Sequence, residues 1–280
     1  MQSIKNSASL PVIYTAHHAS HDFHEFSQRC TLTDEERIRF SDYGTAETVP
    51  RNGIAALVAS HSRALGDLNR DPDDAGRFQE YDYARPSRNP IWLPGKTLSE
   101  KEKAELHQRF YIPFHNEIIH QLRAVTQPML VVAWDNTADY IIGKNNVGDD
   151  VQMPSFVLSN RGGEETAETS DEETSCDPLL FTTLRDNFVR ELQSAGLPHD
   201  VHLNLVYRGG YITRRYSTRR AAKALHELGI TQPIQSLQLE YNTKLTHDQI
   251  TLDPNPEAIT RLRQAFERAI DQTLREVTLA

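Results

Sequence analysis

Residues 129–134 read Met-Leu-Val-Val-Ala-Trp, an uninterrupted apolar run between Pro128 and Asp135. A short run without polar alternation is typical of a β-strand that is buried on both of its faces. A strand of this kind implies helices on either side of a sheet. The run therefore predicts an α/β domain.

Four more short apolar runs predict further strands, each bounded by turn or polar residues. They are residues 11–14, 54–58, 201–206 and 234–239. Amphipathic patterns between and after these runs predict four helices. The predicted helices are residues 98–125, with a break or bend at Pro113, and residues 179–195, 217–228 and 256–279. The alternation of strands and helices agrees with an α/β class.

Residues 162–176, GGEETAETSDEETSC, depart from this pattern. The segment is acidic, has no aromatic side chain, and its one aliphatic side chain is Ala167. Such a segment buries too little apolar surface to offset the entropy lost on ordering. We expect a solvated, mobile insertion here, in preference to a cation site or an acidic lid.

The composition excludes several classes of partner. Thirty basic and 39 acidic side chains give a formal net charge of -9, which argues against a broad nucleic-acid surface. No apolar run approaches the roughly 18 residues of a membrane span, and the N-terminus lacks the apolar core of an export signal. Two cysteines, Cys30 and Cys176, fit a reducing compartment. We expect a soluble, cytoplasmic protein without a membrane partner.

Ligands of α/β proteins bind beyond the carboxyl ends of the strands, so the residues that follow each run carry the candidate chemistry. Residues 15–25 hold four histidines and two carboxylates, a set of side chains that suits zinc. They read Thr-Ala-His-His-Ala-Ser-His-Asp-Phe-His-Glu. Histidines that face water are an equally good interpretation. Glu240 ends an otherwise apolar strand and is either a general base or acid, or a hydrogen-bonded structural carboxylate.

Two other loops carry groups that suit a carboxylate-bearing ligand. Asn69 and Arg70 stand side by side, and the guanidinium group suits bidentate binding of a carboxylate. The alternative is a structural ion pair between Asp67 and Arg70. Gly210, with the glycine before it, permits a tight turn or a close approach of the backbone to a ligand.

Six motifs in one order resemble the N-formylglutamate amidohydrolase family, which is distantly similar to the zinc carboxypeptidases and the aspartoacylases. The motifs are His17-His18-Ala19-Ser20, Ser41-Asp42-Tyr43-Gly44-Thr45, Ser62-Arg63 with Asp67-Leu68-Asn69-Arg70, Arg109 with Pro113-Phe114-His115, Tyr207-Arg208-Gly209-Gly210-Tyr211, and Leu237-Gln238-Leu239-Glu240-Tyr241-Asn242. The resemblance covers residues 17–245. It implies a single α/β domain over residues 1–280 with a mixed central sheet flanked by helices on both faces, like that of the zinc carboxypeptidases. It also implies a small-molecule substrate whose scissile amide lies next to a carboxylate.

The resemblance implies a role for each matching position. His18 and Asp42 match ligands of Zn²⁺ or another divalent metal. Glu240 matches the residue that activates water, and Arg63 the group that polarises the scissile carbonyl. The positions matched to substrate binding are Asn69, Arg70, Tyr207 and Gly210.

The third strand departs from the family, which usually reads Asp-x-His-Ser there, with the histidine as a metal ligand. This chain reads Asp135-Asn136-Thr137, and we assign Asn136 to the ligand position. A carboxamide oxygen binds zinc poorly, so the affinity would fall unless His17 or His21 substitutes. The sequence therefore leaves open a metal-dependent amidohydrolase of N-formyl or N-acyl amino acids, a catalytically silent homologue that binds a carboxylate ligand, and a peptidase-like activity.

Overall fold

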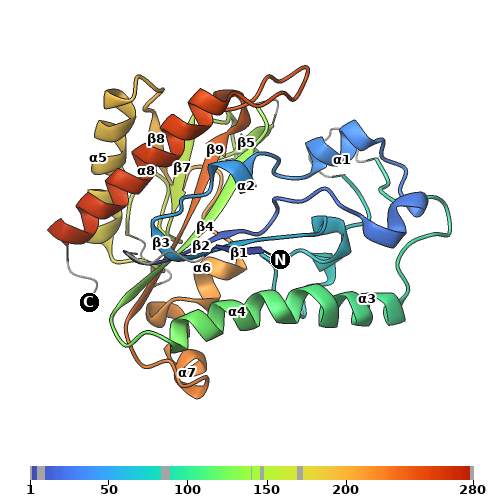
Figure 1. Ribbon diagram of the computed structural model, residues 1–280, viewed down its shortest axis with the longest axis horizontal. Helices are drawn as coiled ribbons and strands as arrows, with labels where there is room; N and C mark the ends of the chain where they lie inside the picture. Colours follow the sequence, from blue (N-terminus) through green and yellow to red (C-terminus); the bar gives the residue numbers. More distant parts are fainter. Residues whose placement is uncertain are drawn as a thin grey trace.

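The computed structural model describes residues 2–4, 10–82, 89–139, 141–145, 148–168 and 173–277. Within them, seven strands form one sheet in the order β1-β3-β2-β4-β9-β7-β8 (Figure 1). These strands are β1 (Gln2–Ile4), β2 (Leu10–Ala16), β3 (Gly53–Val58), β4 (Met129–Thr137), β7 (Phe156–Ser159), β8 (Val201–Leu203) and β9 (Ile234–Asn242). The central strands β3, β2, β4 and β9 are parallel, whereas β1 and β7 pair antiparallel with β3 and β9. The sheet is therefore mixed, as expected.

Helices cover both faces of this sheet (Figure 1). One face carries α5 (Pro178–Ser194) and α8 (Pro256–Glu276), and the other carries α4 (Ile112–Arg123), α6 (Tyr211–Arg215) and α7 (Thr218–Glu227). The other described elements are α1 (Asp34–Phe40), α2 (Thr45–Thr48), α3 (Glu100–Leu106), and a hairpin of β5 (Ile142–Lys144) and β6 (Asp150–Gln152). This arrangement confirms the expected α/β class.

Strand β4 explains why its sequence is apolar without alternation. Successive side chains of a strand point to opposite faces. Val132 and Trp134 therefore enter the core beneath α5 and α8, while Val131 and Ala133 enter the core beneath α4, α6 and α7. The Trp134 ring meets the Phe266 ring of α8 edge-on, with 5.0 Å between centroids. Every residue of β4 is buried, as the sequence predicts.

The predicted helices are present with modified ends. The helix expected over residues 98–125 begins at a capping box of Ser99 and Glu102, and a π-helical turn over His107–Tyr111 joins α3 to α4. The expected irregularity at Pro113 takes this form, with the proline in the first turn of α4. Proline has no N–H to continue the hydrogen-bond ladder of the joined helices, and the π-helical turn just before it takes up the irregularity. Residues 278 and 279 of the last predicted helix lie outside the described residues.

Two segments differ from the prediction. The strand expected over residues 201–206 ends at Leu203, because Asn204 and Val206 have φ angles of 54° and 63°, in the left-handed region. Within the acidic segment 162–176, residues 169–172 lie outside the described residues, but the described ends pack on the sheet. Ser175 donates to the carbonyls of Ser236 (2.7 Å) and, through its backbone N–H, Asn160 (2.8 Å), which does not fit a fully solvated insertion.

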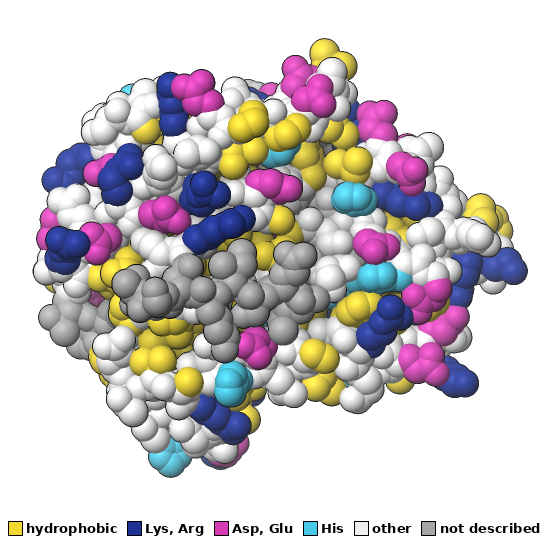
Figure 2. Space-filling view, in the orientation of Figure 1, with side chains coloured by type: hydrophobic (Ala, Val, Ile, Leu, Met, Phe, Trp, Pro, Cys, Tyr) yellow, Lys and Arg dark blue, Asp and Glu magenta, His cyan; other side chains and the backbone are white. Residues whose placement is uncertain are grey.

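Two further observations concern the distribution of surface charge and the apolarity of the helices. On the face shown in Figure 2, acidic and basic side chains are interspersed rather than gathered by sign. No helix within the described residues has the length and apolarity needed to span a membrane.

His115 of α4 ties three parts of the structure together. Its Nε2–H donates to the Leu68 carbonyl at 3.1 Å, so Nδ1 accepts from the Tyr216 hydroxyl at 2.7 Å. The bond to Leu68 anchors the loop that contains Asn69 and Arg70. Burial lowers the pKa of His115 to about 3, so the imidazole is neutral near pH 7.

The neutral state of His115 predicts a pH dependence of stability. Below the ordinary pKa of 6.5 the unfolded histidine binds a proton that the folded one resists, so the free energy of unfolding should fall as the pH is lowered from 6.5 towards 3. Replacement His115→Gln should lower the free energy of unfolding near pH 7 by about 1–3 kcal/mol and reduce its further loss in acid. Urea unfolding at about pH 7.5 and about pH 5.5 measures both effects.

The exposed His226 is the control, and His226→Gln should leave both values nearly unchanged. Some acid dependence should remain in His115→Gln because burial also lowers the pKa of His61, to about 4. An unaltered difference between the two pH values in His115→Gln would contradict the assignment.

Candidate active site

One cavity of about 440 Å³ lies at the carboxyl ends of β2, β4 and β9. It is lined by every site residue that the sequence predicts: His18, Asp42, Arg63, Asn69, Arg70, Asn136, Tyr207, Gly210 and Glu240. Loops that are far apart in the chain therefore meet at one place, where α/β proteins bind their ligands.

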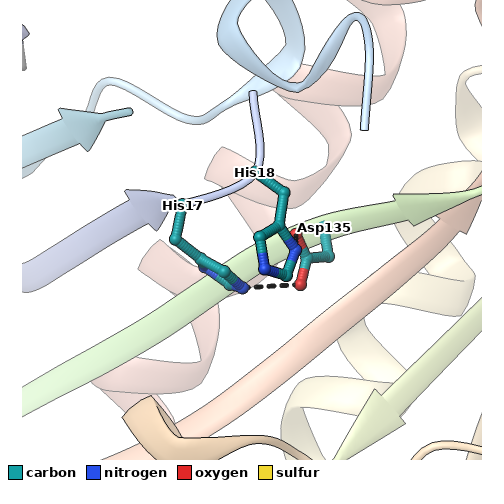
Figure 3. A group of neighbouring side chains, drawn as sticks. All are labelled: His17, His18 and Asp135. Carbon is teal, nitrogen blue, oxygen red and sulfur yellow. Dashed lines mark ion pairs between the residues drawn. The ribbon is translucent and has the colours of Figure 1, made fainter. Parts of the chain in front are cut away.

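His17, His18 and Asp135 form a compact group, which we call the histidine–aspartate group (Figure 3). Both histidines directly follow β2, and Asp135 lies near the end of the adjacent strand β4. His17 Nε2 is 2.7 Å from Asp135 Oδ2, and His18 Nδ1 is 3.3 Å from Asp135 Oδ1. The candidate ligand atoms of the three residues all lie within 4.8 Å of one another.

Further carboxylates surround this group. His18 Nε2 is 2.7 Å from Asp67 Oδ1, and His18 Nδ1 is 3.1 Å from Asp42 Oδ2. Arg63 forms an ion pair with Asp42. Burial raises the pKa of Asp42 to about 7, with Asp135 acting in the same direction. Acidic groups thus outnumber the arginine in a buried space, which favours a further positive charge.

The histidine–aspartate group fits a divalent metal ion. His17 Nε2 and Asp135 Oδ1 are buried and make no hydrogen bond of good geometry, and the polar contacts nearest to them are the ion pairs within the group itself. Burial also lowers the pKa of His17, which favours the neutral imidazole that metal binding requires. The neighbouring carboxylates raise the pKa of His18 well above its ordinary value, so a metal ion would displace a proton there. Two imidazole nitrogens and one carboxylate oxygen are a donor set of catalytic zinc sites and of non-haem iron sites. The residues present therefore suit a metal, with His17 and Asp135 in the set where the sequence predicts Asn136 and Asp42.

Asn136 lines the cavity but has a different role from the predicted one. Its side-chain nitrogen donates to the Tyr43 carbonyl at 2.6 Å and lies 3.1 Å from the Tyr241 hydroxyl. Adjacent residues of a strand face opposite sides, so Thr137 shares the face of Asp135 and Asn136 does not. This geometry corrects the assignment of Asn136 as a metal ligand. In the Asp-x-His pattern Asp135 is the aspartate, so the histidine position is that of Thr137 and not that of Asn136.

Glu240 faces the cavity from β9, directly opposite Asp135 in the strand register. Thr137 Oγ1 donates to Glu240 Oε2 at 2.9 Å, and Gln238 Nε2 donates to Glu240 Oε1 at 2.6 Å. Burial, with Asp135 and Asp42 nearby, raises the pKa of Glu240 well above its usual range. A carboxyl group in this state can hold and release a proton.

Arg70 also lines the cavity, and its side chain is 44% exposed. Its Nε is 3.3 Å from Asp67, and its Nη1 is 3.3 Å from Asp74. The Tyr111 hydroxyl, from the π-helical turn, donates to the Arg70 carbonyl at 2.9 Å. The guanidinium is therefore held at the cavity wall while still accessible to a ligand.

Asn69 and Gly210 bring two loops into contact beside Arg70. Asn69 accepts backbone hydrogen bonds from Tyr211 (3.0 Å, to its carbonyl) and Ile212 (2.9 Å, to Oδ1). A Cβ atom on Gly210 would lie 2.2 Å from Asn69 Nδ2, so a glycine is required at this position. Tyr207 lines the same wall, and burial together with Glu240 raises the pKa of its phenol, which therefore stays protonated.

Sequence reasoning did not assign three residues that the structure brings into the site. Asp67 was considered only as a partner of Arg70, yet it also binds His18. Asp135 and Gln238 could have been found from strand periodicity, because each lies on the same face as a residue of the site. His21, the other substitute considered for the missing ligand, is exposed and does not line the cavity.

Comparisons with known proteins give two kinds of likeness, to solved structures and to a family model. A crystal structure of an N-formylglutamate amidohydrolase from Ralstonia eutropha JMP134 superposes with a TM-score of 0.71 at 20% identity, over 99% of this chain and 98% of that one. A gene product of Agrobacterium tumefaciens superposes with a TM-score of 0.59 at 16% identity, over 95% and 91% of the two chains. A metallo-carboxypeptidase from Burkholderia cenocepacia gives 0.37 at 11% identity, over 98% and 60%. No curated protein matches the sequence significantly.

The two structures with TM-scores of 0.71 and 0.59 show that the chain shares their fold. The model of the family described as N-formylglutamate amidohydrolase matches residues 10–232, well over half of the 280 residues. The resemblance noted from the six sequence motifs is thereby confirmed, and the chain belongs to the N-formylglutamate amidohydrolase family.

Proposed function

We propose that the protein is a metal-dependent amidohydrolase that cleaves the amide of an N-formyl or N-acyl amino acid into an acid and a free amino acid. One observation carries this proposal: His18, Asp135, Glu240 and Arg70 all line one cavity, and the buried His17 contacts Asp135 beside it. A buried acid, a metal-binding donor set and an accessible guanidinium are the groups that hydrolysis of an amide beside a carboxylate requires.

His17, His18 and Asp135 would hold Zn²⁺ or another divalent ion, which supplies Lewis acidity to the scissile carbonyl and to water. Glu240 accepts a proton from the attacking water and delivers it to the leaving amine. The hydrogen bonds from Thr137 and Gln238 favour the carboxylate that accepts the proton, and the burial that raises the pKa of Glu240 favours retention of the proton until the amine leaves.

Two arginine residues each stabilise one negative charge, that of the tetrahedral intermediate or that of the substrate carboxylate. Arg63 lies on the Asp42 side of the cavity and stabilises the oxyanion of the tetrahedral intermediate. Arg70 and Asn69 bind the carboxylate of the substrate, and Tyr207 and Gly210 contact it from the neighbouring loop. This binding orients the amide towards Glu240.

A second candidate is a catalytically silent protein that binds a carboxylate ligand. The observation in its favour is that His18 and Arg63 already pair with Asp67 and Asp42, so that part of the charge is balanced within the protein. Thr137 also replaces the histidine expected from the family pattern. Metal content and turnover distinguish the two candidates.

Glu240→Gln tests the proton-transfer role. The amide cannot accept a proton from water, so kcat for the release of formate or amino acid should fall about 10²–10⁴-fold, while KM stays within about threefold. Glu227→Gln, on the exposed surface of α7, is the control and should keep the parental rate. Parental turnover in Glu240→Gln would eliminate this mechanism.

Metal analysis tests the cofactor. Protein purified without added metal should contain about one divalent ion per chain, and a chelator should remove both the ion and the activity. His17→Ala should lose most of the metal, whereas His21→Ala, an exposed neighbour in the same loop, should retain it. Absence of metal and turnover, together with retained binding of N-acyl amino acids, would favour the silent candidate.

Arg70→Met tests the recognition of the carboxylate. Loss of a charge-assisted contact should raise KM roughly 10–100-fold for N-formyl amino acids, with a smaller change in kcat. The parental enzyme should prefer a free carboxylate over the corresponding carboxamide, and the variant should lose that preference. Arg185→Met on α5, outside the cavity, provides the control. An unchanged preference would show that the carboxylate binds elsewhere.

A further inference from the structure

Gln238 is placed at the centre of the site although no chemical step is assigned to it. It lies two residues before Glu240 on β9, on the same face of the strand, and is only 4% exposed. Its neighbours Leu237 and Leu239 enter the apolar core on the opposite face. A buried carboxamide in such a position is costly unless its polar atoms are paired.

The side chain of Gln238 is paired at both ends. Oε1 accepts from the backbone N–H of Gly210 at 2.9 Å and from Asn69 Nδ2 at 3.4 Å. Nε2 donates to Glu240 Oε1 at 2.6 Å and to Asp135 Oδ2 at 3.4 Å. Because a backbone N–H can only donate, Oε1 has to face Gly210, and this determines the orientation of the amide.

These bonds connect the two halves of the site. The Oε1 side contacts the two loops that bear Asn69 and Gly210, which are also joined by the backbone bond from Tyr211 to Asn69. The Nε2 side contacts the acid that moves the proton and the carboxylate of the histidine–aspartate group. A glutamine offers an acceptor to the first side and a neutral donor to the second without taking up or losing a proton.

We propose that Gln238 is a positioning residue that holds the substrate-carboxylate loops and the Glu240 carboxylate at a constant separation. This inference rests on the proposed function, which assigns proton transfer to Glu240 and substrate binding to Asn69. Gln238 lines the cavity and bonds directly to Glu240, and the role proposed for it is exerted through the residues that bind the substrate and move the proton. Its loss therefore affects binding and turnover together.

The test compares Gln238→Met with Gln235→Met. Methionine keeps the length of the side chain but removes its donor and acceptor. Gln235 is the matched control, since it is a buried glutamine of the same strand whose Oε1 binds the backbone N–H of Asp177, outside the cavity. For Gln238→Met, kcat/KM should fall about 100-fold, with a raised KM and a lowered kcat. Gln235→Met should lower thermal stability but leave both constants unchanged per folded molecule.

Hydrogen exchange provides a readout that does not depend on catalysis. The Gly210 amide should exchange faster in Gln238→Met than in the parental protein, and at the parental rate in Gln235→Met. If Gln238→Met keeps KM and the protection of Gly210, the positioning role is overturned. If the parental protein shows no hydrolysis, the proposed function fails, and exchange at Gly210 still decides the structural link made by Gln238.

Discussion

The parallel pairing of β4 with β9 is the constraint on which the cores and the site both depend. The register runs without interruption from Met129 opposite Ile234 to Thr137 opposite Asn242. Because side chains alternate, the same register that sends Trp134 and Leu239 into one core sets Asp135 opposite Glu240 on the other face. A shift of β9 by one residue would turn Glu240 towards the apolar core beneath α5 and α8 and Leu239 towards the cavity, so apolar packing determines where the charged groups stand.

The sequence predicted the long, strongly patterned elements well. Strands β2, β3, β4 and β9 and helices α5, α7 and α8 all lie where the apolar pattern indicates. The short strand β7 was not predicted, because four residues carry too little pattern to separate a strand from a loop. The described ends of segment 162–176 are held by hydrogen bonds of polar residues such as Asn160 and Ser175, which an argument from apolar content does not count.

Motif order predicted which residues would meet, and all of the predicted residues border the cavity. It did not predict their individual partners, because these depend on contacts between distant strands and loops. Asn136 illustrates the limit: its neighbours in sequence are site residues, but the pleat of β4 directs it to Tyr43 and Tyr241. The spacing of the histidines in the sequence also could not show whether His17 or His21 lies in the site. The position of Asp135 on the adjacent strand brings His17 into the histidine–aspartate group.

The distance in sequence between β4 and β9 has a consequence for biosynthesis. Val131 and Ser236, which contact each other in the finished sheet, are 105 residues apart. A chain emerging from the ribosome therefore presents the apolar edge of β4 well before its partner strand has been made. Contacts of such high order slow folding, and an unpaired strand edge can recruit other chains during the delay. Recovery of soluble material is thus governed by the rate of synthesis and by chaperones as well as by the final free energy.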